Sequence, residues 1–92
     1  MPPKLDPGTR RAAVAIGERI RAARLAAEVS QETLAAKIGM TRGNYSRIEA
    51  GLTNVTLDSL LRIAKGLGIT LTVDFESPSA SGPRRARMTS RT

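Results

Sequence analysis

Arg42, Asn44 and Arg47 stand within six positions near the middle of the sequence. The planar fork of an arginine guanidinium matches O6 and N7 of guanine, and an asparagine amide can form a bidentate pair with adenine. Thr41, just before them, offers both a hydroxyl and a methyl group. Side chains of these types could hydrogen-bond to base edges if a helix presented them to DNA.

Catalytic chemistry has little support in this composition. The chain contains no histidine and no cysteine, so the usual general base, the thiolate nucleophile and the commonest metal ligands are missing. Ser30, Ser46 and Ser59 have no histidine to activate them. We therefore expect the chain not to be an enzyme, and we expect no cofactor and no metal site.

The charge is strongly positive but is concentrated at the two ends. The formal net charge is +7, whereas residues 12–76 carry eight basic and seven acidic side chains. A basic chain suits a polyanionic partner. The arginines after residue 83 either attract phosphates in a non-specific, salt-dependent way or are solvated filler. Specific recognition must therefore come from the placement of side chains in the nearly neutral middle.

Four helices are predicted to position the candidate recognition residues. Apolar residues recur at helical spacing, Ser30, Thr41 and Thr56 are of N-cap type, and glycine follows each of the last three helices. The first helix starts either after Asp6 or at Thr9, which are both plausible caps. The expected helices cover residues 9–28, 31–38, 41–50 and 57–67.

After residue 68 the pattern changes to the alternation of a strand. Ile69, Leu71, Val73 and Phe75 alternate with polar residues, which predicts a single β-strand over residues 69–76. No second strand is expected elsewhere in the chain, so its backbone groups would need a partner strand from another molecule. Pairing across a two-fold axis would bury these four apolar side chains and make a homodimer.

The chain is expected to form one domain with tails, because 92 residues close a single hydrophobic core. The first residues lack a secretory signal and no apolar run is long enough to span a bilayer, so we expect a cytoplasmic protein without a membrane contact. We expect a flexible arm over residues 1–8, a helical domain over 9–68, a dimerisation strand over 69–76 and a disordered basic tail over 77–92.

The segments from Ser30 to Ala35, Gly39 to Thr41 and Ser46 to Gly51 carry a family resemblance. In order and spacing they resemble the lambda-repressor and Cro type of helix-turn-helix domain, also called the XRE family, over about residues 13–68. The resemblance implies a mainly α fold: a compact four-helix lambda-repressor-like helix-turn-helix domain, here with one C-terminal β-strand that pairs across a dimer. It also implies double-stranded DNA as the partner, read in its major groove.

The resemblance implies DNA contacts at the start of the third helix. Gly43 there would either let the DNA come close or simply be tolerated near a helix start. Gln31 would bond a phosphate from the first turn of the second helix, or be a solvated polar residue beside the cap. Thr53 and Asn54 would lie near the DNA backbone. The residues that would point into the groove are Thr41, Arg42, Gly43, Asn44, Ser46 and Arg47.

Other prominent residues fit structural roles. Arg24 and Glu49 match a pair that forms a partly buried salt bridge between the first and third helices of similar repressors. Glu49 is therefore interpreted as part of the scaffold and not as a catalytic acid. Tyr45 shares the inward face of its helix with Ile48, which favours a place in the core over a base-stacking platform.

The strand after the fourth helix is similar to that of Hip-type antitoxins, in which it pairs across a two-fold axis. The leading hypothesis is a homodimeric transcriptional regulator, an autorepressor, that binds an inverted-repeat operator. An added hypothesis makes it the antitoxin of a co-encoded toxin protein. The alternatives are a phage-type or restriction-controller regulator without a toxin partner, and a protein-interaction module whose DNA binding is vestigial.

Overall fold

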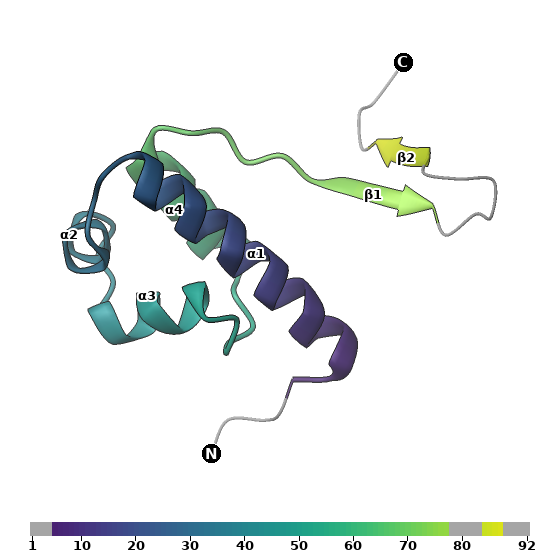
Figure 1. Ribbon diagram of the computed structural model, residues 1–92, viewed down its shortest axis with the longest axis horizontal. Coiled ribbons are helices and arrows are strands. Elements are labelled where there is room, and N and C mark those ends of the chain that lie inside the picture. Colours follow the sequence, from purple (N-terminus) through teal and green to yellow (C-terminus); the bar gives the residue numbers. More distant parts are fainter. Residues whose placement is uncertain (1–4, 78–83, 88–92) are drawn as a thin grey trace.

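The computed structural model describes residues 5–77 and 84–87 of the chain. The helices pack into one body, from which the strand segment extends (Figure 1). This arrangement confirms the predicted mainly α, four-helix fold. No helix in the described segments is long and apolar enough to cross a membrane. The elements are α1 (Pro7–Ala26), α2 (Gln31–Lys37), α3 (Arg42–Glu49), α4 (Leu57–Leu67), β1 (Asp74–Ser77) and β2 (Arg84–Arg87).

The last three helices start and stop where the sequence indicated. Ser30, Thr41 and Thr56 each accept a hydrogen bond from the backbone N–H three residues further on, at 3.0, 3.1 and 3.0 Å. Each bond satisfies a donor that the first turn of a helix cannot satisfy by itself. The glycines at positions 39, 51 and 68 have φ angles of 75°, 72° and 70°, the left-handed conformation that ends a helix.

The first helix begins earlier than the predicted domain boundary. Asp6 accepts the backbone N–H of Thr9 at 3.0 Å, so α1 starts at Pro7. Proline suits the first helical position, and the cap offsets the low helix propensity of Gly8. The predicted arm over residues 1–8 is therefore too long, and residues 1–4 lie outside the described part of the chain.

The core lies where the four helices meet. Its largest fully buried side chains are Leu34 of α2, Tyr45 of α3 and Ile63 of α4, and Ile20 of α1 packs with them. Gly17 lets α1 approach α3, because a Cβ atom there would lie 2.4 Å from the carbonyl oxygen of Glu49. The core thus holds the back of α3 against the rest of the domain and leaves its front to solvent.

The C-terminal segment differs from the prediction of one lone strand over residues 69–76. Residues 69–73 are not in a strand, and β1 pairs antiparallel with β2 of the same chain. The strand β2 was not predicted from the sequence, because Arg84–Arg87 has no β-branched or aromatic residue. In the register of the two strands, Asp74 lies opposite Arg87 and Glu76 opposite Arg85.

The prediction of a disordered tail over residues 77–92 is wrong for two parts of that range. Ser77 belongs to β1, and residues 84–87 form β2. The rest of the predicted tail, residues 78–83 and 88–92, lies outside the described residues. Pairing of strands between two copies of the chain stays a prediction.

Candidate nucleic-acid interface

Helix α3 has two faces of opposite character. Tyr45 and Ile48 point into the core, with exposed fractions of 0% and 6%. Arg42, Asn44 and Arg47 are exposed on the other side. The helix therefore presents outward the three side chains whose chemistry suits base edges, and it hides the two that the sequence placed inside.

Three smaller residues complete the outer surface of α3. The hydroxyl of Thr41 is engaged as the N-cap, which leaves its methyl group and its hydroxyl proton for other contacts. Gly43 is exposed, and a Cβ atom there would meet nothing within 4 Å, so packing within the chain does not require glycine. Ser46 is half-buried at the edge of this surface.

A hollow of about 380 Å³ runs beside the exposed face of α3. Asn44 and Arg47 line it from α3, and Asn54 lines it from the loop that follows. Arg62 of α4 also lines the hollow and forms an exposed ion pair with Asp58 at 3.3 Å. The structure therefore brings Asn54 next to the candidate recognition residues and adds Arg62, which was not predicted from the sequence. The spacing of four between Asp58 and Arg62 indicates their ion pair but not the position of Arg62 beside α3.

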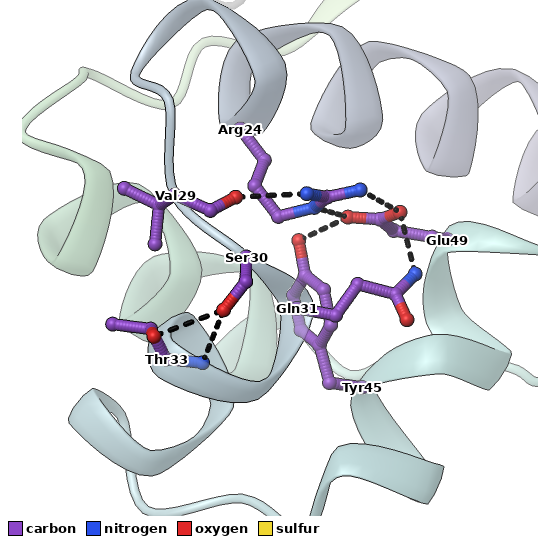
Figure 2. Close-up of polar contacts among 7 residues, drawn as sticks. All are labelled: Arg24, Val29, Ser30, Gln31, Thr33, Tyr45 and Glu49. Carbon is purple, nitrogen blue, oxygen red and sulfur yellow. Dashed lines mark hydrogen bonds and ion pairs between the residues drawn. The ribbon is translucent and has the colours of Figure 1, made fainter.

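Behind this surface, a buried ion pair joins α1 to α3 (Figure 2). Arg24 Nε lies 2.6 Å from Glu49 Oε2, and both side chains are almost fully buried. A second bond runs from Arg24 Nη2 to Glu49 Oε1 at 3.2 Å, and Nη1 donates to the carbonyl oxygen of Val29 at 2.8 Å. The structure thus contains the salt bridge that the family resemblance implied.

Two further side chains donate to the same carboxylate. The hydroxyl of Tyr45 donates to Glu49 Oε2 at 2.5 Å, and Gln31 Nε2 donates to Glu49 Oε1 at 3.0 Å (Figure 2). Tyr45 lies in the core as predicted, but its hydrogen bond was not anticipated. Gln31, expected to bond a phosphate, is half-buried and reaches inward to Glu49.

The network holds its members in defined charge states. Burial favours the neutral acid of Glu49, but hydrogen bonds from Arg24, Tyr45 and Gln31 outweigh it and keep the pKa of Glu49 below its ordinary value. The hydrogen bond to Glu49 raises the pKa of Arg24. Burial, and then the hydrogen bond to Glu49, raise the pKa of Tyr45. At neutral pH the network therefore consists of a cation, an anion and a neutral phenol.

The part of the chain that the structure describes contains no cluster of metal-ligand side chains. No group of three or more histidine, cysteine, aspartate or glutamate residues comes together there. The polar groups that do assemble are suited to hydrogen bonding with a polyanion and with base edges.

Comparison with known proteins gives consistent similarities. Residues 20–73 match the helix-turn-helix family HTH_3. The chain is 50% identical over 48 residues to the control protein C.MunI of a Mycoplasma species, a match that covers 52% of this chain and 65% of that protein. It is 41% identical over 54 residues to the control protein C.BamHI of Bacillus amyloliquefaciens, covering 58% of this chain and 67% of that protein. This chain therefore spans just under two thirds of the length of C.MunI.

A solved structure shows the same architecture. The restriction-modification controller protein C.AhdI of Aeromonas hydrophila superposes with a TM-score of 0.65 at 38% sequence identity. The superposition covers 66% of this chain and 88% of C.AhdI. The fold of the helical body is thus similar to that of a controller protein.

Proposed function

Because the chain belongs to the helix-turn-helix family of DNA-binding transcriptional regulators, we propose that it binds an inverted-repeat operator as a homodimer and represses its own promoter. One observation carries this proposal: α3 buries Tyr45 and Ile48 and exposes Arg42, Asn44 and Arg47. An α-helix fits the major groove of B-DNA, where its outward side chains reach base edges.

Each exposed side chain of α3 has a defined task in this proposal. Arg42 and Arg47 donate to O6 and N7 of guanine, and Asn44 pairs with adenine. Thr41, Gly43 and Ser46 shape the surface around them. Phosphate contacts from Gln31 and from the loop at Thr53 and Asn54 set the register of the helix in the groove.

Exposed apolar side chains support the homodimer. Ile69, Val73 and Phe75 have exposed fractions of 49%, 50% and 53%, and Leu71 is half-buried. Burial of these exposed apolar side chains against a second copy of the chain would stabilise a dimer. A two-fold dimer would place its recognition helices about 34 Å apart, so the half-sites would lie roughly one helical turn apart or a small multiple of that.

The relatives favour one alternative for the biological role. The control proteins C.MunI and C.BamHI and the restriction-modification controller C.AhdI all resemble this chain. This similarity supports a restriction-controller regulator over the antitoxin hypothesis. A restriction or modification gene beside this one would favour the controller role, and a kinase-like toxin gene there would favour the antitoxin role. We propose no catalytic reaction, because the chain has no histidine or cysteine.

Selection of bound DNA from a random pool tests the proposal. The wild-type protein should return an inverted repeat, and Arg42→Ala should relax the preference at one base pair in each half-site, at a cost of about 1 to 3 kcal/mol. Arg21→Ala is a matched control, since Arg21 is an exposed arginine on α1. It should leave the base preferences unchanged. Unchanged base preferences in Arg42→Ala would refute the role given to Arg42.

A further inference from the structure

The carboxylate of Glu49 is the meeting point of three helices. Its four hydrogen bonds come from Arg24 of α1, Gln31 of α2 and Tyr45 of α3, with two from Arg24. Both carboxylate oxygens therefore accept two donors each, and no buried polar side-chain atom in the described residues is left without a partner. One acceptor group therefore links α1, α2 and α3, and the donor to each oxygen can be removed separately.

The link to Glu49 fixes the orientation of the Gln31 amide. A carboxylate only accepts hydrogen bonds, so the NH₂ end of the amide must face Glu49 and the carbonyl end must face away, as in Figure 2. One N–H of that NH₂ group is bound to Glu49. The second N–H is left for another acceptor, in a direction that the planar amide sets.

This constraint distinguishes Gln31 from the other candidate contacts. In the described part of the chain, the side chains of Arg42 and Arg47 have no hydrogen-bond or ion-pair partner, and both residues are exposed. They must give up side-chain freedom when they bind. Gln31 is half-buried and already held, so it loses less freedom on contact with a phosphate.

We propose that Glu49 is a positioning residue for DNA binding: it holds the Gln31 amide so that its second N–H meets a phosphate of the operator. The inference rests on the proposed function, because it requires that a DNA backbone lies against the start of α2. Through Arg24 and Tyr45, the same carboxylate ties that contact to α1 and to the recognition helix. The phosphate contact and the base contacts would thus keep a fixed position relative to each other.

The first test uses the free wild-type protein. Gln31 is the only glutamine, so in ¹⁵N-labelled protein its side-chain NH₂ signals are readily assigned, and those of Asn44 and Asn54 serve as references. We expect the Gln31 signals to shift as acid titrates Glu49, while the reference signals stay. Gln31 signals that behave like those of the two asparagines would overturn the inference.

The second test measures operator affinity at one fixed salt concentration. Gln31→Met keeps the length of the side chain but cannot donate, so operator binding should weaken by roughly 10- to 100-fold, the loss of one hydrogen bond to a charged group. The slope of log K against log salt should stay as in the wild type, because glutamine carries no charge and releases no counterion. Glu49→Gln should weaken binding by a similar factor, because Arg24 takes its one amide oxygen and its NH₂ group then faces that of Gln31. The double variant should bind no more weakly than Gln31→Met.

Tyr45→Phe is the matched control. It removes one donor from Glu49 Oε2 but leaves the bond of Gln31 to Oε1, so it should lower stability without changing the operator affinity. If Glu49→Gln lowers stability but keeps the wild-type affinity, Glu49 is structural only and the inference fails. If Glu49→Gln does not fold, the wild-type titration and Gln31→Met decide instead.

Failure of the inference can be told apart from failure of the proposed function. If the wild-type protein selects an operator and Gln31→Met binds it with wild-type affinity, the inference alone is overturned. If the wild-type protein selects no operator, the proposed function is overturned and the inference with it. A shifted Gln31 signal, together with similar losses of affinity in Gln31→Met and Glu49→Gln, supports both.

Discussion

Replacing Gly43 by alanine should stabilise the protein and weaken its DNA binding. The new methyl group would meet no atom of the chain within 4 Å, and Gly43 does not have a positive φ angle. Alanine in a helix interior is favoured over glycine by about 0.5 to 1 kcal/mol, which is an upper bound for Gly43 because it is the second residue of α3. A change of that size raises the melting temperature of a domain this small by roughly 2 to 8 °C.

The effect on DNA binding should have the opposite sign. Gly43 lies between Arg42 and Asn44 on the exposed face of α3. A methyl group there would hold the helix away from the floor of the groove and stretch the hydrogen bonds of its neighbours. Loss of about 1.4 kcal/mol, the lower part of the range for one bidentate base contact, corresponds to tenfold weaker binding. Thermal unfolding and fluorescence anisotropy on the selected operator measure the two effects.

Gly17→Ala is the matched control for this experiment. Its Cβ atom would lie 2.4 Å from the carbonyl oxygen of Glu49 and 2.6 Å from that of Ile48, so the backbones of α1 and α3 would have to separate. Overpacking of this kind costs about 1 to 3 kcal/mol, and the melting temperature should fall. A stabilised Gly43→Ala protein with wild-type affinity would show that the glycine is merely tolerated, and the idea of a close approach to DNA would be abandoned.

Three further measurements test the core, the buried network and the dimer. Leu34→Ala empties a fully buried site and should cost about 2 to 5 kcal/mol of unfolding free energy, measured by urea denaturation. Because the folded pKa of Glu49 lies below its ordinary value of 4.5, its stabilisation is complete above about pH 4.5 and is lost as pH falls through the folded pKa. Glu49→Gln should therefore flatten the acid limb of a plot of stability against pH, and an unchanged limb would contradict the pKa direction. Val73→Asp should sediment as a monomer and Thr72→Asp as a dimer; a dimeric Val73→Asp protein would move the interface elsewhere.

Helix boundaries could be predicted because they depend on residues close in sequence. The hydroxyl of Thr41 caps α3 by accepting the N–H of Asn44, three residues away, and Gly51 ends the helix with a left-handed φ of 72°. The periodicity that places Tyr45 and Ile48 on the inner face acts over the same short range. The outward placement of Arg42 and Arg47 follows from it, since they lie on the other side of the same helix.

The second strand could not be predicted in the same way. Arg84–Arg87 has neither alternating apolar residues nor β-favouring types, so no local preference marks it as a strand. Its pairing depends on alignment with Asp74–Ser77 across an intervening segment of six residues. Such an alignment involves two segments together, and neither segment taken alone carries the information.

The same distinction between local and long-range information applies to the candidate site. Periodicity identified the inner residues of α3, and resemblance to a family indicated roles for its outer residues, for Gln31 and for the pair of Arg24 and Glu49. Only the tertiary structure showed that Gln31 and Tyr45 donate to the carboxylate of Glu49. Gln31 is 18 residues from Glu49 in the chain, so their contact depends on how α2 packs across α3. Caps and periodicity act within a few residues and are encoded locally, whereas the meeting of side chains from three helices is decided by the core that brings those helices together.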